Sequence, residues 1–597
     1  MKISYLFSSL LVITALSFTS CKSESKGAKE YTSPEWAKGI VWYQIFPERF
    51  RDGDSTNQPN RERARGPEGW EITSWTQDWY ARDDWEKNHS DDFYSIVRER
   101  RYGGDLQGVI DKLDYLKELG VGGIYLNPIF DAQSMHKYDA SYYHHIDRNF
   151  GPNSDADVDQ FNAEDPGVSS TWEWTSGDKL FLQLIQEAHK RDMKVVIDGV
   201  FNHTGTEFWA FQDLVKNQEQ SRYKDWYIVN EFDDPSTEKN EFDYEGWWGF
   251  KGLPVFREEN ENLLLPIRKH IFDVTKRWMD PNGDGDPSDG VDGWRLDVAE
   301  EVGKNFWVEW HEVVRDLNPE AITIAEIWTD KAKEFISADM FTTVMNYRFA
   351  YAAKDYFIDE RISISEFEQR LNQVEEDYPK EGLDVLQNLM DSHDTPRLAS
   401  IIVNPNREYD RDGLPRDGFN PRKPNEKERA VQKLVAIFQY TWKGAPMIYY
   451  GTESGMWGAD DPDDRKPMVW EDMNYESESN HPLGEPRTSD DNNFDSELFN
   501  FYQKLAEIRN TSLAIQKGDA DFVELNEETG LVVFKRTIKN EPSVYVALNR
   551  SLEPLSYIIN SCSYTDLMSS ELVDSDDCTI ELIVPAISGR IIEVEER

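Results

Sequence analysis

The chain of 597 residues is poor in cysteine, in positive charge and in long apolar runs. Its three cysteines, Cys21, Cys562 and Cys578, form no zinc-binding or redox motif. Cys562 and Cys578 either form a disulfide or remain free thiols, because their spacing alone cannot establish a pairing. The 65 Lys and Arg are outnumbered by 113 Asp and Glu, for a formal net charge of -48. That charge would repel nucleic acid and anionic membrane surfaces, so we exclude both as binding partners.

The N-terminal segment carries an apolar run over residues 6–18 that is too short and too early for a membrane-spanning helix. Together with Lys2 and the small residues after the run, it indicates a secretory signal peptide over residues 1–21. Phe18-Thr-Ser-Cys21 resembles the cleavage box of bacterial lipoproteins, which implies a lipid on Cys21. The alternative is plain secretion with cleavage near Ser20. We therefore expect an exported protein, held in the cell envelope only through Cys21 and a polar tether over residues 22–37.

Strand-like and helix-like segments alternate along most of the chain, as in a parallel α/β fold. Eight segments have the pattern of short buried strands: residues 40–46, 121–127, 194–198, 291–296, 321–326, 341–346, 383–390 and 446–450. Amphipathic helices are predicted between and after them, at residues 103–119, 179–191, 265–279, 303–317, 364–376, 426–442 and 495–511. Eight such units make up a (β/α)8 TIM barrel.

Three stretches depart from this alternation. Residues 203–262 are aromatic, acidic and irregular, which indicates an excursion domain after the third strand, and residues 59–101 are interpreted as a long loop or insertion. Short alternating strands over residues 514–597 indicate a C-terminal antiparallel β-sandwich domain. The predicted barrel therefore comprises residues 38–202 and 263–513.

The fourth predicted strand ends with an arginine and a carboxylate two residues apart, in Gly293-Trp-Arg-Leu-Asp-Val298. Side chains two apart on a strand point to the same side. Arg295 and Asp297 could therefore share one pocket, where the cation would keep the carboxylate ionised. An ionised, fixed aspartate suits a covalent nucleophile in sugar transfer. The alternative is an ordinary ion pair at a strand end.

Three more carboxylates end predicted strands: Asp198 the third, Glu326 the fifth and Asp394 the seventh. His203 and His393 lie just beyond two of these strand ends. The carboxyl ends of barrel strands converge at one mouth, so we expect these side chains to meet there. Such a concentration favours a functional site over scattered structural ion pairs.

These segments resemble the sequence motifs of the α-amylase family, glycoside hydrolase family 13. Asp198-Gly-Val-Phe-Asn-His203 is similar to the first motif, residues 293–297 to the second, Glu326-Ile-Trp328 to the third and Ser392-His-Asp394 to the fourth. The motifs occur in the order and spacing of the family, and the resemblance covers residues 38–597.

The resemblance implies a retaining glycosidase with Asp297 as nucleophile, Glu326 as general acid/base and Asp394 as the residue that grips the sugar hydroxyls. It also implies a set of substrate-binding side chains: Tyr138, which would stack under the sugar, His136, Asp198, His203, Arg295, Trp328 and His393. From the residues themselves, Arg295 should lower the pKa of Asp297, whereas the apolar neighbours of Glu326 could raise that of Glu326.

Two acidic loops could bind Ca²⁺, a hard cation that takes six to eight oxygen ligands. The first resembles a calcium site of amylases and cyclodextrin-forming relatives and comprises Asp52, Asp54, Asn57, Gln58, the Gly103 carbonyl and Asp105. The second is spaced like the start of an EF-hand loop, with Val291 in place of the closing glutamate, and comprises Asp280, Asn282, Asp284 and Asp286. The alternative for each is an acidic turn that caps its own backbone.

Departures from typical α-amylases place the chain nearest the neopullulanase and cyclomaltodextrinase branch, since Glu300 and Glu301 replace a Lys-His pair after the nucleophile segment. We expect hydrolysis of α-1,4 bonds in starch, maltodextrin, pullulan or cyclodextrin. The alternatives are a transglycosylase or an α-1,6-acting enzyme on the same scaffold, and a non-catalytic starch-binding lipoprotein. Four tryptophans either line acceptor subsites or pack in the core or rim: Trp172, Trp174, Trp247 and Trp248.

Overall fold

The computed structural model describes residues 30–411 and 413–595, and its centre is one eight-stranded sheet. The sheet order is β10-β9-β8-β3-β2-β1-β12-β11, and all neighbouring strands pair in parallel. The strands are β1 (Trp42–Ile45), β2 (Gly123–Leu126), β3 (Lys194–Gly199), β8 (Gly293–Leu296), β9 (Ile322–Ala325), β10 (Thr343–Val344), β11 (Gln387–Asn388) and β12 (Ala445–Tyr449). A parallel bridge between Met345 and Gln387 joins the two edges. The predicted TIM barrel is therefore confirmed.

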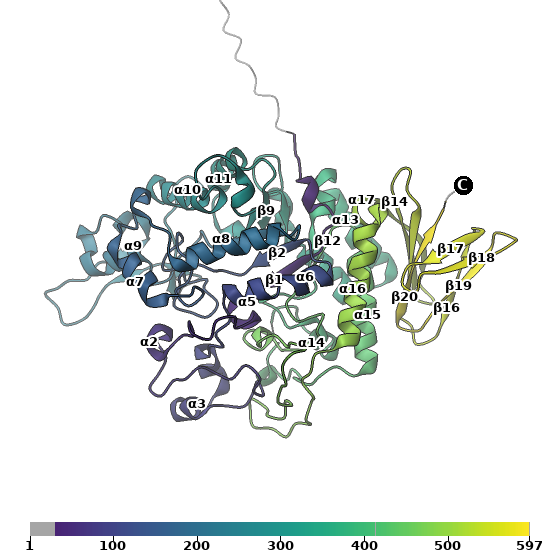
Figure 1. Ribbon diagram of the computed structural model, residues 1–597, viewed down its shortest axis with the longest axis horizontal. Helices are drawn as coiled ribbons and strands as arrows, with labels where there is room; N and C mark the ends of the chain where they lie inside the picture. Colours follow the sequence, from purple (N-terminus) through teal and green to yellow (C-terminus); the bar gives the residue numbers. More distant parts are fainter. Residues whose placement is uncertain (1–29, 412, 596–597) are drawn as a thin grey trace, which may run out of the picture. The chain divides into compact units, whose positions relative to one another are not determined.

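Helices alternate with these strands along the chain and lie around the sheet (Figure 1). They are α5 (Leu106–Asp111), α6 (Leu113–Leu119), α8 (Ser176–His189), α10 (Leu265–Met279), α11 (Lys304–Leu317), α12 (Tyr347–Ala353), α13 (Ile364–Asp377), α15 (Glu426–Thr441) and α16 (Ser496–Thr511). Helix α8 begins at a capping box of Thr175 and Asp178, and it buries an apolar stripe that includes Phe181, Leu184 and Ile185. The single helix predicted before β2 is two helices, because the backbone leaves helical geometry at Lys112.

The segment predicted as a long loop at residues 59–101 contains short helices packed around aromatic side chains. The helices are α2 (Arg61–Ala64), α3 (Asp84–His89) and α4 (Phe93–Ile96). Trp79, Phe93 and Tyr102 belong to one small buried cluster. Beside it, the fully buried Arg100 and Glu86 form an ion pair of 2.8 Å. Each helix is too short to give a sequence period, which is why the pattern predicted none.

The segment between β3 and α10 holds one α-helix, two short 3-10 helices and two small hairpins. These elements are α9 (Trp209–Asn217), β4 (Val229–Glu231), β5 (Asp243–Tyr244), β6 (Gly246–Trp247) and β7 (Phe250–Pro254). The residues after the β6–β7 hairpin form two bridges, one between Val255 and His203, just beyond β3, and one between Phe256 and Tyr227 of the same segment. The hairpin therefore lies at the carboxyl end of β3.

The C-terminal strands form the predicted antiparallel β structure. A six-stranded sheet in the order β13-β14-β15-β20-β17-β18 accompanies the two-stranded sheet β16-β19. The strands are β13 (Asp519–Asn526), β14 (Leu531–Thr537), β15 (Ser543–Asn549), β16 (Leu555–Ile559), β17 (Ser563–Asp566), β18 (Glu571–Asp574), β19 (Ile580–Val584) and β20 (Ser588–Val594). Trp442, just after α15, packs edge-to-face on Phe534 of β14, with ring centroids 5.0 Å apart. An aromatic contact thus joins the barrel to this sheet.

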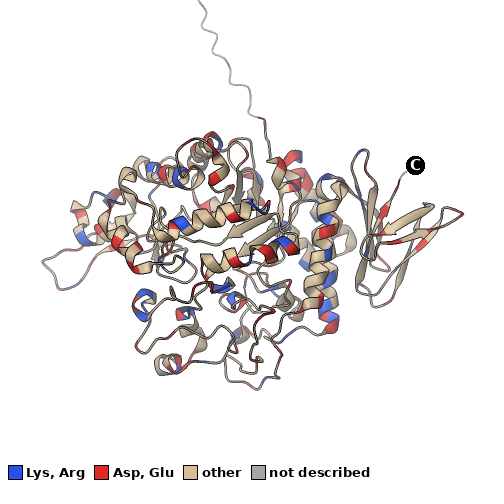
Figure 2. Cartoon of the chain, viewed as in Figure 1, with Lys and Arg blue, Asp and Glu red and all other residues tan. Residues whose placement is uncertain are grey.

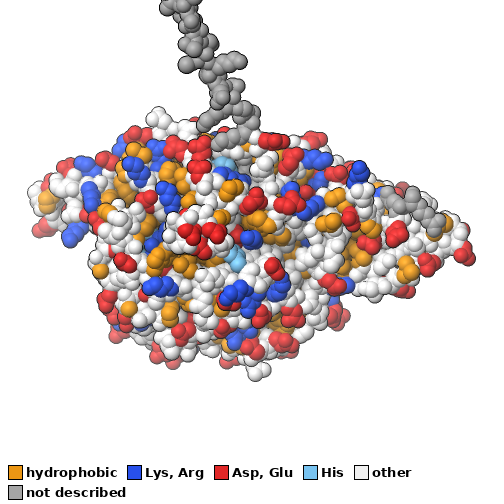
Figure 3. All heavy atoms as spheres, turned by 45° about the horizontal axis from the view of Figure 1, so that its top comes forward, with side chains coloured by type: hydrophobic (Ala, Val, Ile, Leu, Met, Phe, Trp, Pro, Cys, Tyr) orange, Lys and Arg blue, Asp and Glu red, His pale blue; other side chains and the backbone are white. Residues whose placement is uncertain are grey.

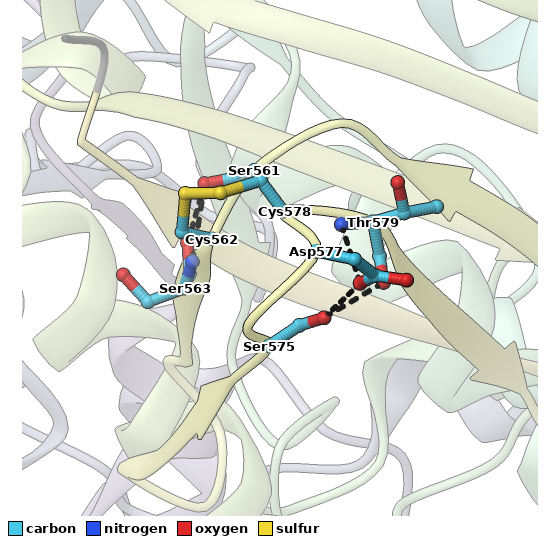
Figure 4. The surroundings of a disulfide bond; sticks show 7 residues. All are labelled: Ser561, Cys562, Ser563, Ser575, Asp577, Cys578 and Thr579. Carbon is cyan, nitrogen blue, oxygen red and sulfur yellow. Dashed lines mark hydrogen bonds between the residues drawn. A yellow bond between two sulfur atoms is a disulfide. The ribbon is translucent and has the colours of Figure 1, made fainter.

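Cys562 and Cys578, whose pairing the sequence left open, form a disulfide that joins the residue just before β17 to the loop before β19 (Figure 4). Cys21, the signal peptide and half of the tether (residues 22–29) lie outside the described residues, so the lipoprotein prediction stays a prediction. Within residues 30–411 and 413–595, no helix combines the length and apolarity that crossing a membrane requires.

Acidic side chains are spread over the molecule and do not form one block. Figure 2 shows Asp and Glu on the barrel helices, the loops and the C-terminal strands, with Lys and Arg between them. On the face seen in Figure 3, acidic groups are likewise scattered among basic and hydrophobic side chains. In the described chain, the acidic residues are therefore distributed over many elements.

Candidate active site

A cavity of ≈ 940 Å³ lies at the carboxyl ends of the barrel strands. Three predicted carboxylates line it: Asp297 after β8, Glu326 after β9 and Asp394 beyond β11. Strands β8 and β9 are hydrogen-bonded neighbours with Leu296 opposite Ala325, so Asp297 and Glu326 emerge side by side. The convergence predicted from the strand-end pattern is thus present in the fold.

Arg295 is fully buried beneath the cavity and contacts three carboxylates. Its Nη1 lies 2.9 Å from Asp198 Oδ1 and 3.0 Å from Asp297 Oδ1, and its Nη2 lies 2.9 Å from Glu326 Oε2. Arg295 and Asp297 therefore share one side of the strand, as expected. Arg295 and Asp198 are not among the lining side chains, so they support the cavity floor.

The predicted low pKa of Asp297 is wrong in direction. Burial raises the pKa of Asp297 well above its ordinary value, and the Glu326 carboxylate raises it further. The charge of Arg295 lowers this pKa, but three carboxylates share that charge. Burial and then Glu326 also raise the pKa of Asp394, to about 7. Burial and mutual repulsion thus oppose the simultaneous ionisation of these neighbouring carboxyls.

Glu326 is fixed by donors from two nearby residues. The Val298 N–H donates to Oε2 at 2.9 Å, and Trp328 Nε1 donates to Oε1 at 2.9 Å. Val298 has a φ of 39°, in the left-handed region that a β-branched residue rarely adopts. Trp328 stacks on Tyr347 with ring centroids 4.0 Å apart, which holds its indole in place.

A hydrogen-bonded chain runs from the barrel interior to the cavity through His393 and Tyr138. Burial and the nearby arginines lower the pKa of His393 well below its ordinary value, so the ring is neutral. Gln44 Nε2 donates to His393 Nδ1 at 2.9 Å, which leaves the imidazole proton on Nε2. This Nε2 contacts the Tyr138 hydroxyl, which donates to Asp198 Oδ2 at 3.0 Å.

His203 and His136 also line the cavity. Burial lowers the pKa of His203 to about 3 and that of His136 well below its ordinary value, so both are neutral. Asn202 Nδ2 donates to His203 Nδ1 at 3.0 Å, and the buried Nε2 has no hydrogen-bond partner in the described chain. His203 can therefore donate its Nε2–H to a ligand oxygen.

Arg465 is a site residue that the sequence reasoning missed. It follows β12, lines the cavity, and places Nη2 3.2 Å from Asp394 Oδ1, while its Nε donates to the His393 carbonyl at 2.7 Å. Its position beyond the eighth predicted strand could have identified it, because active-site residues of such barrels follow the carboxyl ends of the strands.

Aromatic side chains of the β6–β7 hairpin form one rim of the cavity. Trp247 stacks on His203 with centroids 5.4 Å apart, and both Trp248 and Phe250 line the cavity while being 78% and 64% exposed. Trp172 and Trp174 instead stack on His144 and on the Arg277 guanidinium. Trp247 and Trp248 thus line the cavity, whereas Trp172 and Trp174 pack against other side chains, and a role of the first two in acceptor subsites stays a prediction.

The first acidic loop has buried oxygens suited to a cation. Asp105 accepts four hydrogen bonds, from the Gly53, Asp54 and Gly108 N–H groups and from Asn57 Nδ2. Asp52 Oδ1 and Asn57 Oδ1 are buried without a hydrogen-bond partner in the described chain. Gln58 donates to Asp52 Oδ2 at 2.7 Å, and Gly103 packs against the Gln58 side chain. The unpaired oxygens and the oxygen-only donor set fit Ca²⁺.

The second acidic loop uses its side chains on its own backbone. Asp280 accepts from the Asp284 and Gly285 N–H groups, and Asn282 Oδ1 accepts from Asp284 N at 2.8 Å. Asp284 and Asp286 cap the residues two positions later. This is the capped-turn alternative, and calcium at this loop stays a prediction.

Comparison with known proteins finds relatives along most of the chain. The family profile described as "Alpha amylase, catalytic domain" matches residues 44–164 and 175–518. Neopullulanase 2 of Thermoactinomyces vulgaris is 34% identical over 568 residues, 94% of this chain and 79% of that protein. A cyclomaltodextrinase of Geobacillus thermopakistaniensis is 34% identical over 524 residues, 88% of this chain and 71% of that protein.

Solved structures show the same likeness. A type III pullulan hydrolase from Thermococcus kodakarensis superposes with a TM-score of 0.70 at 25% identity, covering 94% of this chain and 83% of that one. The chain is therefore a glycoside hydrolase and belongs to the alpha-amylase family.

Proposed function

We propose that this enzyme hydrolyses α-1,4-glucosidic bonds with retention at the anomeric carbon, through a covalent glucosyl-enzyme intermediate on Asp297. The observation that carries this proposal is the shared contact of Asp297 and Glu326 with one guanidinium, that of Arg295, at the floor of an open cavity. Two carboxylates on one guanidinium lie close together, as the roughly 5–5.5 Å separation of a retaining pair requires.

In the first step, Asp297 bonds to the anomeric carbon while the glycosidic bond breaks and Glu326 gives its proton to the leaving oxygen. In the second, Glu326 takes a proton from water, the water oxygen bonds to the same carbon and the ester with Asp297 breaks. Arg295 positions both carboxylates. Asp394 would hold sugar hydroxyls, with Arg465 restricting its orientation.

The substrates that we propose are starch, maltodextrin, pullulan or cyclodextrin. Tyr138, His136, His203, His393 and Trp328 line the cavity and would bind the sugar in the cleavage subsite. The relatives named neopullulanase and cyclomaltodextrinase support this class of substrate. The acidic surface gives nucleic acid no basis for binding, and calcium at the first acidic loop is part of the proposal.

Transglycosylation, or action on α-1,6 bonds, is the second candidate. The exposed Trp248 and Phe250 on the cavity rim support it, because an acceptor sugar that stacks there could replace water in the second step. A non-catalytic starch-binding lipoprotein is the weaker alternative, since both Asp297 and Glu326 are present and directed at the cavity.

Product analysis tests these alternatives together. We expect chromatography of digests of amylose, pullulan and cyclodextrin to show short maltooligosaccharides, and NMR during the first turnovers to show the α-anomer. Release of the β-anomer would refute retention. Longer products than the substrate would select transglycosylation, and the absence of turnover on all three substrates would select the binding protein.

We further propose that the mature protein is exported and anchored through a lipid on Cys21. The signal-like segment and the cleavage box support this. Mass spectrometry of the membrane fraction should find residues 1–20 removed and Cys21 acylated, whereas a Cys21→Ser variant should be released unmodified. An unmodified Cys21 in mature wild-type protein would exclude the anchor.

A further inference from the structure

The side chains of His144, His145 and Glu164 converge at a point away from the cavity lining. Both histidines lie in the connection between β2 and α7 (Ser154–Ala163), and Glu164 is the residue that ends α7. His144 Nε2 lies 2.7 Å and His145 Nε2 2.8 Å from the same atom, Glu164 Oε1. Among the described residues, this is the group of three His, Cys, Asp or Glu side chains whose donor atoms are close enough to share one ion.

The convergence is buried. The histidine side chains are fully buried and that of Glu164 is 3% exposed. Trp172 covers His144 with ring centroids 4.1 Å apart, and Phe161 stacks on His145 at 4.6 Å. A low-dielectric shell of this kind strengthens a bond between a cation and its ligands.

A contact between Asp178 and His145 Nδ1 orients the imidazole so that Nε2 faces Glu164. Asp178 Oδ2 lies 2.9 Å from His145 Nδ1, and the same carboxylate accepts from the backbone N–H groups of Ile146 and Thr175. Nδ1 therefore faces Asp178, and Nε2 faces Glu164 Oε1, where either a proton or a metal cation can lie between the two atoms. A carboxylate that accepts the far N–H of a ligating histidine is the usual outer partner in protein metal sites.

We propose that His144, His145 and Glu164 bind one divalent transition-metal ion of the zinc class. Two imidazole nitrogens and one carboxylate oxygen are a recurrent zinc donor set, whereas Ca²⁺ takes oxygen ligands alone. Bonds of about 2.0–2.2 Å in tetrahedral geometry would separate the donor atoms by about 3.3 Å, so the three side chains must open by about half an ångström.

The ion would tie together segments that support the active site. The connection that carries the two histidines also carries Tyr138, and Asp178 begins α8. Metal binding would therefore stabilise the β2–α8 region without taking part in glycoside chemistry. The inference does not depend on the proposed function.

Metal analysis of the folded full chain without an affinity tag tests the proposal. We load it with Zn²⁺ alone, remove the excess by gel filtration and measure zinc by mass spectrometry. We expect about one zinc ion per chain, retained in the presence of excess Ca²⁺. Folded wild-type protein that retains no zinc would overturn the proposal and leave a proton between the side chains.

Variants locate the ion. His144→Gln and Glu164→Gln should each retain at least about tenfold less zinc. His189→Gln is the matched control, because His189 Nε2 lies 2.7 Å from Asp292 as a histidine–carboxylate pair outside the group of three. Equal zinc in all three variants would place the metal elsewhere.

If the two ligand variants do not fold, X-ray absorption spectroscopy of the zinc-loaded wild type identifies the atoms bound to zinc. Scattering from two imidazoles and an oxygen ligand would support the site. A sulfur ligand, or fewer than two imidazole ligands, would overturn the proposal.

Discussion

The rings of Tyr138 and His393 lie nearly parallel, 7° apart with centroids at 5.3 Å, and the Tyr138 hydroxyl contacts His393 Nε2. They come from different connections, one after β2 and the other after β11, on two strands that are not neighbours in the sheet. This pair joins two sides of the cavity floor above Asp198.

Tyr138→Phe should lower kcat/KM by roughly tenfold, because it removes one hydroxyl that bonds Asp198 and contacts His393 but keeps the stacking ring. Tyr138→Ala removes both and should lower kcat/KM further. Steady-state kinetics on a maltooligosaccharide measures both variants. Equal losses in the two variants would show that the hydroxyl, and not the ring, carries the effect.

Asp297→Asn should lower turnover by on the order of 10³ or more, since the amide cannot form the covalent intermediate. The same change should not lower the melting temperature above neutral pH, because it removes a buried negative charge whose pKa is raised. Glucan hydrolysis and thermal denaturation are measured on one preparation. Near-normal turnover of the purified variant would contradict the assignment.

Asp460→Asn should stabilise the protein at high pH. Burial and then Asp410 raise the pKa of Asp460 to about 8. A carboxyl with a raised pKa contributes stability below its unfolded pKa of about 3.9, and this contribution is lost as the pH rises through 8. The variant should therefore melt higher than the wild type at pH 9 and not at pH 4. Asp155→Asn, at a side chain 87% exposed, is the control and should show no pH-dependent difference.

Calcium should raise the melting temperature through the first acidic loop. At a concentration about 100 times its dissociation constant, a bound ion stabilises by about 2.7 kcal/mol. Asp52→Ala and Asn57→Ala remove the unpaired oxygens and should abolish the rise that follows when Ca²⁺ alone is added back after chelation. Asp284→Ala tests the second loop, and we expect it to keep the rise. If only Asp284→Ala lost the calcium-dependent rise in melting temperature, the calcium site would be assigned to the second loop.

Removal of the disulfide should destabilise the C-terminal strands and leave catalysis unchanged. Cys562 and Cys578 are 16 residues apart, and a closed loop of about this size contributes about 3 kcal/mol. The double variant Cys562→Ser/Cys578→Ser should be cleaved faster in residues 515–595 by a protease, with kcat intact. Peptide mass mapping with and without reductant checks the pairing, and cleavage equal to that of the wild type would contradict the expected stabilisation.

Much of the fold follows from local pattern. The eight barrel strands, most of the helices and the antiparallel C-terminal strands can be predicted from the sequence, because strands and amphipathic helices repeat their apolar residues with characteristic periods. The short helices at residues 61–96 could not be predicted in this way, since each is too short to show a period. Arg465 was missed for a related reason: its importance comes from a contact with Asp394, 71 positions away.

The sequence by itself determined the barrel, the family resemblance and the identity of the carboxylates, because strand ends and motif order are properties of consecutive residues. Only the tertiary structure decided that Arg295 lies beneath the cavity with three carboxylates on one guanidinium, and that burial raises the pKa of Asp297. The tertiary structure also places the side chains of His144 and His145 next to that of Glu164. Electrostatic balance depends on distance and on excluded water, and neither is set until separate segments pack together.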